Sequence, residues 1–278
     1  MLPKVTIVTP SFNQAAYLEQ TIMSVLNQDY PNIEYIVIDG GSTDSSVDII
    51  KKFQDKLAYW ISEADNGQSC AINKGFKHAT GQIFNWVNSD DLLMPSAVRI
   101  AVHYLIGNPD IGMVYGDRIT IDEGGNFLSL TQVPSYNARV FRHHLRIPQE
   151  TTFFRRELWY EVDGVDEDLK YCMDYDLFVK LSKRTQFYHI PFVLGAYRKH
   201  PLSKTVIYSR SLKTTGREEF DKVYRKHYSK DRSKLKVRFC KKLNKVRLYF
   251  QTRSRSRKRE IDEIVRFIRD SNNTATQG

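Results

Sequence analysis

The chain has 278 residues, of which 41% are hydrophobic and 12% aromatic, which is enough apolar material for one large domain with or without an appendage. Its three cysteines are widely spaced and form no metal-binding pair, which favours a reducing compartment. The sequence shows no signal peptide and no apolar run of about 18 residues, so we expect a cytoplasmic protein without a membrane-spanning helix.

The positive charge is concentrated near the C-terminus. The net charge is +10, yet residues 225–259 hold 16 of the 42 Lys and Arg residues and a single acid, Asp231, which leaves 26 basic and 31 acidic residues elsewhere. A mildly acidic body is therefore followed by a basic tail. We predict a folded domain over 1–215 and a basic, helical C-terminal extension over 216–278.

Strands and helices alternate along the first part of the chain. Residues typical of strands occupy 4–9, 33–38, 57–61 and 83–87, and segments with helical periodicity lie between them. Pro10 is expected to end the first strand, and Asn13 to cap the helix over 14–27. This alternation predicts an α/β fold with a mainly parallel central sheet flanked by helices.

Polar turns follow the three strongest strands, and their sequences are Thr9-Pro10-Ser11, Asp39-Gly40-Gly41 and Asn88-Ser89-Asp90-Asp91. Parallel strands end at one edge of a sheet, so we expect these turns to converge on one site. Asp90 and Asp91 repel each other, and oxygen ligands of this kind suit Mg²⁺ or Mn²⁺ together with substrate phosphates. The alternative is that they cap the helix that opens at Pro95.

The later part of the chain offers weaker signals. Runs typical of strands over 113–122 precede Gly124-Gly125-Asn126, which predicts a hairpin, and 148–156 resembles a strand running into a helix. Asp174 and Asp176 stand at the start of an apolar run. They either perform chemistry or stabilise a helix N-terminus as solvated carboxylates.

Motifs across residues 3–205 resemble, in the right order, those of family 2 glycosyltransferases, which have the GT-A fold. The segments that carry the resemblance are Val5–Asn13, Ile36–Asp44, Asp65–Gln68, Asn88–Asp91, Asp174–Leu177 and Arg198–Ser203. The resemblance implies an inverting transfer of a sugar from a nucleotide-diphosphate donor, with a UDP-sugar favoured, to a hydroxyl of a saccharide or lipid-linked acceptor. It further implies a place in cell-envelope polysaccharide or glycolipid synthesis.

The resemblance also implies roles for donor-side residues. The residues expected to contact the nucleotide are Thr9, Pro10, Ser11, Asp39, Asn88 and Ser89. Asp90 corresponds to the last residue of the family's Asp-x-Asp motif and is expected to bind Mn²⁺ or Mg²⁺. His200 is expected to bind the same ion or to contact the diphosphate, and a structural role is the alternative. The first Asp of that motif is replaced by Asn88, and Asp91 is expected to compensate. For Asp39 a turn-forming role before the two glycines is the alternative.

The remaining roles concern the reaction and the acceptor. Asp174 resembles the family's general base, which takes the proton from the attacking hydroxyl. Asp176 is expected to orient it or to cap the helix. Gln149 and Glu150 are expected to contact the acceptor, and Arg198 to contact the acceptor or the diphosphate.

Two rival functions are considered. A nucleotidyltransferase that makes sugar nucleotides would need a Gly-rich loop with Lys or Arg after the first strand, and Pro10-Ser11-Phe12-Asn13 is not such a loop. A non-catalytic nucleotide-sugar or membrane-binding module is the alternative from another class. The presence of both Asp90 and Asp174 argues against it.

The basic tail contains apolar residues at helical spacing, with Lys and Arg between them: Leu235, Phe239, Leu243, Val246 and Phe250. A basic helix with an apolar face over 235–250 is typical of attachment to an anionic membrane, here peripheral on its inner face. The alternative is a helix that packs on the catalytic domain with its charges solvated. No nucleic acid is expected as a partner, because the body offers no basic surface that would extend the tail.

Overall fold

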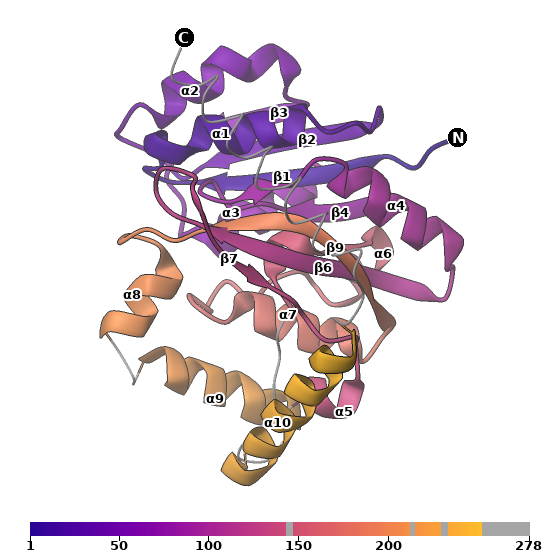
Figure 1. The fold of residues 1–278 in the computed structure, drawn as a ribbon. Coiled ribbons are helices and arrows are strands. Elements are labelled where there is room, and N and C mark those ends of the chain that lie inside the picture. Colours follow the sequence, from indigo (N-terminus) through magenta and orange to yellow (C-terminus); the bar gives the residue numbers. More distant parts are fainter. Residues whose placement is uncertain (143–146, 212–214, 229–232, 252–278) are drawn as a thin grey trace.

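The computed structural model describes residues 1–142, 147–211, 215–228 and 233–251 as a sheet with helices on both faces (Figure 1). The strands are β1 Val5–Ser11, β2 Ile33–Asp39, β3 Tyr59–Ser62, β4 Ile83–Trp86, β5 Leu92–Leu93, β6 Ile111–Ile121, β7 Phe127–Thr131, β8 Phe153–Arg155 and β9 Gln186–Arg198. The α-helices are α1 Ala15–Leu26, α2 Ser46–Phe53, α3 Gln68–Lys77, α4 Ala97–Gly107, α5 Ala138–Phe141, α6 Arg156–Glu161, α7 Met173–Ser182, α8 Lys204–Ser211, α9 Thr215–Tyr228 and α10 Lys234–Gln251. Single 3₁₀ turns occupy Gln54–Lys56 and Gln149–Thr151.

The strands form one sheet in the order β3-β2-β1-β4-β8-β6-β9-β5, with β7 paired to β6. The first four strands are parallel, as the alternating pattern predicted. The short strand β8 is antiparallel to both β4 and β6, and β6 and β9 are parallel. The predicted α/β sheet flanked by helices is therefore confirmed, and its parallel pairs are those of β3-β2-β1-β4 and of β6 with β9.

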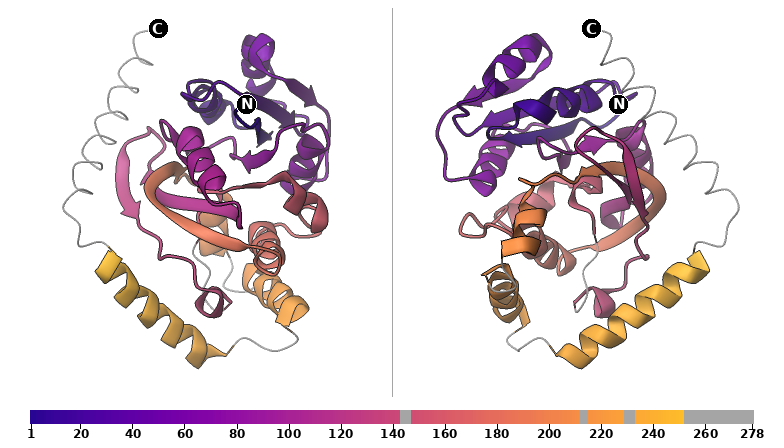
Figure 2. Two further views of the ribbon diagram at one scale, coloured as in Figure 1. Left: turned by 90° about the vertical axis from the view of Figure 1, so that its right-hand side faces the viewer. Right: turned by 60° about the vertical axis from the view of Figure 1, so that its left-hand side comes forward.

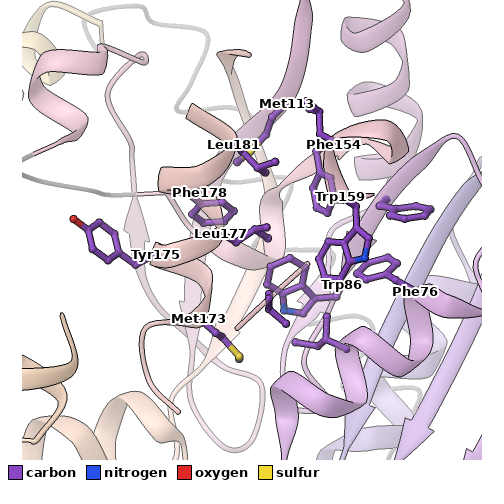
Figure 3. Close-up of a cluster of buried hydrophobic side chains, with 14 of the residues drawn as sticks. Phe76, Trp86, Met113, Phe154, Trp159, Met173, Tyr175, Leu177, Phe178 and Leu181 are labelled. Carbon is purple, nitrogen blue, oxygen red and sulfur yellow. The ribbon is translucent and has the colours of Figure 1, made fainter. Parts of the chain in front are cut away.

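Two apolar layers hold the helices to the sheet. Alternate residues of a strand point to opposite faces, so Ile7 of β1 packs against α1, α2 and α4, whereas Val8 packs against α3 and α7. The second layer contains a dense aromatic group, in which Phe76 of α3 stacks on Phe84 of β4 at 4.5 Å between ring centroids. Figure 3 shows how the side chains of α7 enter this layer. Helix α7 is thus fixed to the sheet by its apolar face.

Two details of the first turn differ from the prediction. Strand β1 continues through Pro10 to Ser11, because its pairing with β2 extends to Ser11 opposite Asp39. The predicted cap at Asn13 is wrong, since α1 begins at Ala15. The Asn13 backbone has a φ of 51°, and its side-chain oxygen accepts a hydrogen bond from Thr43 N at 2.8 Å. The carboxylate of Asp44 accepts from Ala15 N at 3.0 Å and serves the helix start instead.

The second half of the chain builds the other side of the sheet and a helical end. The segment 111–121 forms one long strand, β6, and the predicted hairpin is confirmed, with Gly125 at a φ of 82° in its turn. Helices α8, α9 and α10 lie together at one end of the molecule (Figure 2). The predicted helix over 235–250 is confirmed as α10, and the part of the extension beyond Gln251 lies outside the described residues. Across the described ranges, no helix has the length and apolarity needed to cross a membrane.

Candidate active site

A cavity of about 520 Å³ opens at the carboxyl ends of the parallel strands. Its wall is formed by the turns after β1, β2, β3 and β4 together with the segment between β9 and α8. The residues that line it are Pro10, Ser11, Phe12, Asn13, Gln14, Gly40, Asp65, Gly67, Gln68, Ala71, Asn88, Ser89, Asp90, Asp91, Tyr197, Leu202, Ser203, Lys204, Thr205 and Ile207. The predicted convergence of polar turns on one site is therefore confirmed.

The turn after β1 presents Pro10 and Ser11 to the cavity. The Ser11 hydroxyl is buried and has no hydrogen-bond partner among the described residues, so it is available to a ligand. Thr9, one residue earlier, is fully buried and its hydroxyl pairs with the Tyr35 hydroxyl at 3.0 Å. Thr9 thus stabilises the turn from within the protein and does not line the cavity.

Asp39 organises the turn after β2. It is fully buried, and its Oδ2 accepts hydrogen bonds from Gly41 N at 3.1 Å, Ser42 N at 2.8 Å and Ser62 Oγ at 2.7 Å. Its Oδ1 accepts from Ser42 Oγ at 2.6 Å. Gly40 is the part of this turn that faces the cavity, and a Cβ there would lie 3.0 Å from the Asp65 carboxylate. The geometry therefore favours the turn-forming alternative for Asp39.

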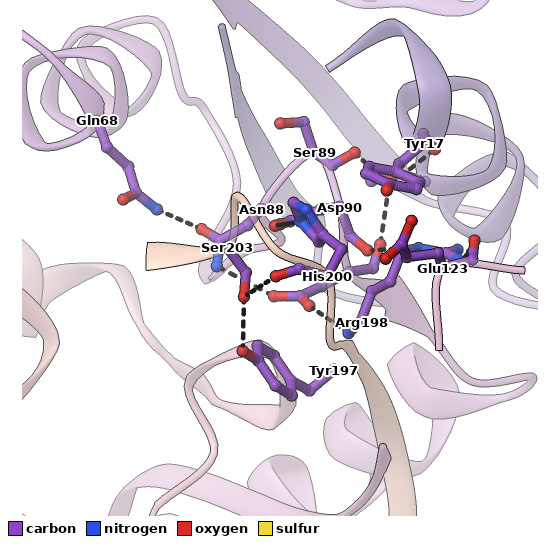
Figure 4. A network of polar contacts seen from close by, with 12 residues as sticks. Tyr17, Gln68, Asn88, Ser89, Asp90, Glu123, Tyr197, Arg198, His200 and Ser203 are labelled. Carbon is purple, nitrogen blue, oxygen red and sulfur yellow. Dashed lines mark hydrogen bonds and ion pairs between the residues drawn. The ribbon is translucent and has the colours of Figure 1, made fainter. Parts of the chain in front are cut away.

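Asp90 and His200 meet at the edge of the cavity (Figure 4). The Asp90 Oδ2 and His200 Nε2 atoms are 2.9 Å apart, and the imidazole is almost fully buried beside the Tyr17 ring at 4.6 Å. The Asp90 side chain keeps 16% of its surface exposed. These two groups, predicted from motifs more than 100 residues apart, are brought together by the pairing of β5 with β9.

Asp91 does not join this pair. It is 2% exposed, and its Oδ1 accepts from Arg198 N at 3.0 Å while its Oδ2 accepts from Asn88 Nδ2 at 3.1 Å. Burial, followed by the charges of Asp90 and Glu150, raises the pKa of Asp91 well above its ordinary value. The expectation that Asp91 replaces the missing carboxylate at position 88 is not supported, because both of its oxygens are turned into the protein.

A chain of amide groups crosses the cavity wall from Asn88. Its Oδ1 accepts from Gln68 Nε2 at 2.6 Å, and Gln68 Oε1 accepts from Lys204 Nζ at 2.7 Å. The surrounding protein lowers the pKa of Lys204 by reducing the hydration of its ammonium group, while Glu219 and Asp90 oppose this effect. Ser89 lines the cavity beside Asn88.

Arg198 was predicted to contact the acceptor or the diphosphate, but the structure places it in the protein interior. Its side chain is fully buried, and Nε donates to Asp90 O at 3.0 Å and Nη2 to Gln20 Oε1 at 2.6 Å. Nη1 donates to the carbonyls of Asp122 and Glu123. Arg198 therefore ties the Asp90 turn to α1 and to the β6–β7 hairpin and does not line the cavity.

The Asp90–His200 pair fits a divalent cation that is shared with a ligand. Its carboxylate oxygen suits Mg²⁺ and Mn²⁺, and the neighbouring imidazole nitrogen would supply a second protein ligand. The described residues contain no group of three or more His, Cys, Asp or Glu side chains that could hold a metal. The remaining positions would be filled by phosphate oxygens and water, which is the usual mode for Mg²⁺ and Mn²⁺.

The predicted base lies in a second group of charges next to the cavity. Asp174 is half-buried in the first turn of α7, and its surroundings raise its pKa to about 6. Desolvation is the main cause. The charge of Glu150 also raises the pKa, whereas Arg118 and backbone hydrogen bonds lower it. A carboxylate with a pKa near 6 is ionised at neutral pH and accepts a proton more readily than an ordinary Asp.

Arg118 links this group to the cavity. Its guanidinium lies 4.9 Å from the ring centroid of Tyr197, which lines the cavity, and 3.5 Å from Glu150 Oε1. Glu150 is 2% exposed, and its Oε1 has no hydrogen-bond partner in the described part of the chain. Gln149, in contrast, donates to Trp86 O at 2.7 Å and closes the end of β4. Glu150 Oε1 thus pairs with a charge but accepts no hydrogen bond from the described residues, whereas the Gln149 amide already donates to the backbone.

Asp176 neither orients Asp174 nor caps α7. It is fully buried and pairs with His227 Nε2 at 2.7 Å and with Lys180 Nζ at 3.0 Å. These hydrogen bonds and positive charges outweigh the effect of burial and lower its pKa to about 2. Asp176 therefore joins α7 to α9.

Sequence reasoning did not assign three residues that the structure brings to the site: Gln68, Arg118 and Lys204. Gln68 is the last residue of the motif Asp65–Gln68, and Lys204 directly follows the motif Arg198–Ser203. Assigning a role to each polar residue in and next to these motifs would have identified both. Arg118 stands in the middle of β6 without a local signal. Its role depends on the pairing of β6 with β9, which brings it opposite Gly195 and near Tyr197.

Residues 6–162 match the family model described as glycosyl transferase family 2. Among curated relatives, an uncharacterized glycosyltransferase of Rickettsia bellii is 31% identical over 216 residues, which cover 71% of this chain and 30% of that protein. The chain therefore spans less than a third of the length of this relative.

Two solved structures resemble the fold. The structure of residues 1–349 of Staphylococcus aureus TarS in complex with UDP-GlcNAc is 19% identical at a TM-score of 0.65, over 79% of this chain and 64% of that one. The mannosyltransferase PcManGT of Pyrobaculum calidifontis, in complex with GDP-Man and Mn²⁺, is 20% identical at a TM-score of 0.58, over 76% of this chain and 60% of that one. The GT-A fold predicted from the motifs is thereby confirmed.

Arg198 was predicted to contact a ligand, whereas the structure gives it a buried structural role. The variant Arg198→Lys separates these two interpretations. Lysine keeps the charge but cannot reach four acceptors, so we expect the free energy of unfolding in urea to fall by about 3 kcal/mol. Arg99→Lys, which changes an exposed ion pair with Asp29, is the control and should lose less than about 1 kcal/mol. Unchanged stability of Arg198→Lys together with weaker UDP binding would instead support the ligand contact predicted from the sequence.

Proposed function

This chain belongs to glycosyl transferase family 2, and we propose that it is an inverting enzyme that transfers a sugar from a nucleotide-diphosphate donor to a hydroxyl acceptor. The observation that carries the proposal is the arrangement of the cavity. Backbone turns and the free Ser11 hydroxyl suit a nucleoside, and the Asp90–His200 pair and Lys204 suit a diphosphate. Asp174 stands beyond Tyr197 and Arg118 with its pKa raised to about 6.

Each group has a place in the transfer. The acceptor oxygen forms a bond to the anomeric carbon as its proton passes to the Asp174 carboxylate, and the bond from that carbon to the diphosphate oxygen breaks. The nucleoside diphosphate leaves with the bonding electrons. Lys204, whose ammonium group faces the cavity wall, stabilises the charge that develops on it. A Mn²⁺ or Mg²⁺ ion held by Asp90 and His200 would supply further positive charge at the diphosphate.

The acceptor side is assigned to Glu150 and Arg118. Glu150 Oε1 forms an ion pair with Arg118 Nη1 at 3.5 Å, but this oxygen and Arg118 Nε are both buried and have no hydrogen-bond partner among the described residues. A sugar hydroxyl that donates to Glu150 and accepts from Arg118 would satisfy both groups, which favours a saccharide acceptor. We favour UDP-GlcNAc as the donor probe because the TarS complex contains it, and GDP-Man is the competing donor.

The donor half of the site can be tested by calorimetric titration of UDP, GDP and dTDP with and without Mn²⁺. We expect UDP to bind in a metal-dependent way, and Asp90→Ala to lower the affinity in Mn²⁺ by at least about tenfold. The exposed Asp55→Ala is the matched control and should bind as the wild type does. Equal binding by Asp90→Ala with and without Mn²⁺, at the wild-type level, would remove Asp90 from the metal site.

The reaction can be tested through Asp174→Asn, which keeps the shape of the side chain but cannot accept the proton. We expect release of UDP from UDP-GlcNAc to slow by about 10²- to 10⁴-fold while UDP affinity stays unchanged. The wild-type rate should rise as the pH increases through about 6, where Asp174 loses its proton. Asp168→Asn, an exposed acid in the preceding loop, is the control. A wild-type rate in Asp174→Asn would exclude this base and move the proposal to a non-catalytic binding module.

We further propose that α10 attaches the protein to an anionic membrane surface. Its buried side contains Cys240 and Asn244, and Arg247 donates to Ser135 O at 2.9 Å, so one face packs on the protein. The neighbouring face of the helix exposes an apolar row formed by Leu235, Phe239, Leu243 and Val246. The exposed cations around this row are Lys236, Arg238, Lys241, Lys242 and Lys245. Exposed apolar side chains among cations fit lipid headgroups and acyl chains better than a purely solvated face.

The membrane contact predicts sedimentation of the protein with phosphatidylglycerol vesicles but not with phosphatidylcholine vesicles. The double variant Leu235→Ser/Phe239→Ser should lose most of this binding, because both side chains are exposed and their loss leaves the packed face intact. Ile106→Ser removes an exposed apolar side chain from α4 and is the control. Wild-type binding by the double variant, or equal binding to neutral vesicles, would contradict the assignment.

A further inference from the structure

Helix α9 provides a carboxylate to the start of the helix that carries the proposed base. Glu219 Oε1 accepts hydrogen bonds from Tyr171 N at 2.8 Å and Cys172 N at 2.7 Å, and its Oε2 accepts from Lys170 N at 3.2 Å. Three consecutive backbone donors thus point at one side chain that is more than 45 residues away in the sequence.

Glu219 binds the amide of the N-cap residue Cys172 and the two amides that precede it. The first amides of a helix have no partner within it, and α7 begins at Met173 after a Cys172 that makes no side-chain capping bond. A negative charge at this end also interacts favourably with the helix dipole. Glu219 therefore stabilises the turn in which Asp174 lies.

The rest of α9 fixes its position along α7. Phe220 stacks on Tyr175 at 4.2 Å between ring centroids, and His227 pairs with the buried Asp176. Val223 and Tyr224 are almost fully buried between these contacts. A shift of Glu219 would have to break this whole set, so its carboxylate is held at the helix start.

The loop before α7 is held from the other side by α3. Ser69 donates to Leu169 O at 3.0 Å and Asn73 donates to Val165 O at 2.9 Å. Gln68, the first residue of the same helix, lines the donor cavity. The loop and the Asp174 turn are thus positioned between the donor site on one side and α9 on the other.

We propose that Glu219 is a positioning residue for the general base, fixing the first turn of α7 so that Asp174 faces the acceptor hydroxyl. This inference rests on the proposed function. Glu219 lies beyond the residues matched by the family model, in the segment predicted as an extension. The helical extension is then part of the active site's framework.

The charge of Glu219 also affects the Cys172 thiol at the start of α7. Burial, Asp174 and Glu219 together raise the pKa of the Cys172 thiol, so both carboxylates act on one small region. The charged groups that act on Asp174 itself are Glu150 and Arg118. Replacing Glu219 by a neutral residue leaves those two in place, so it should release the position of Asp174 without changing the direction of its pKa shift.

The test compares Glu219→Gln with Glu219→Asp and with Glu218→Gln, an exposed neighbour on the same helix. For release of UDP from UDP-GlcNAc we expect Glu219→Gln to lower kcat by about 10- to 100-fold at an unchanged KM for the donor. The acidic limb of its pH–rate profile should stay where it is in the wild type, because Glu150 and Arg118 remain beside Asp174. Glu219→Asp should restore part of kcat, and Glu218→Gln should match the wild type.

Two controls keep this inference separate from the proposed function. If Asp174→Asn is inactive and Glu219→Gln retains wild-type kcat, only the positioning role is overturned. A parallel fall in kcat, UDP affinity and melting temperature would also overturn it, since that pattern indicates general destabilisation. Alkylation of Cys172, followed by mass spectrometry, needs no turnover. It should be faster in Glu219→Gln than in Glu218→Gln, and equal rates would contradict the capping role.

Discussion

The buried guanidinium of Arg198 is the contact on which the arrangement of the site depends. It bonds to the carbonyl of Asp90, to Gln20 of α1 and to two carbonyls of the β6–β7 hairpin. A buried cation is tolerated only where its donors are satisfied, and this one is satisfied by three separate segments. The Asp90 turn is therefore held in the position in which the Asp90 carboxylate contacts the His200 imidazole. Arg198 therefore acts on the site through the backbone carbonyl of Asp90, and the Asp90 side chain that it positions lines the cavity.

The charge balance of the cavity follows from that turn. Asn88 stands where an acid is expected and Asp91 is turned inward, so Asp90 is the acid of this turn that pairs with the imidazole. One carboxylate attracts a divalent cation less strongly than two, so an ion at the proposed site would depend more on the phosphates of the donor. Lys204, held by Gln68, adds a fixed positive charge on the same wall. In the proposed function, the site would thus combine a small set of protein ligands with a cationic side chain, both facing the donor diphosphate.

Much of the fold and part of the site could be predicted from sequence because the signals were local. The strands before Pro10, Asp39 and Asn88 have clear patterns, and parallel pairing forces their ends together. The sequence did not predict the roles of residues that depend on partners far away in the chain. Phe154 of β8 pairs with both Phe84 and Met113, so the strand predicted within 148–156 enters the sheet antiparallel to both neighbours, which its local pattern does not indicate. A motif likewise names Asp39 or Arg198 without showing whether the side chain faces a ligand or the interior.

The basic tail shows most clearly why composition alone was insufficient. Its charge suggested attachment to a membrane surface along its whole length. Its two described helices differ, however, in how much of their surface packs on the rest of the protein. Helix α9 turns Glu219 and His227 toward α7 and buries its apolar residues, so it belongs to the framework of the proposed base. Helix α10 packs through a narrow face and leaves Phe239 exposed among cations. If α10 rests on a membrane, α9 connects that surface to the turn that carries Asp174, and a lipid-linked acceptor would approach the base from the side on which the membrane lies.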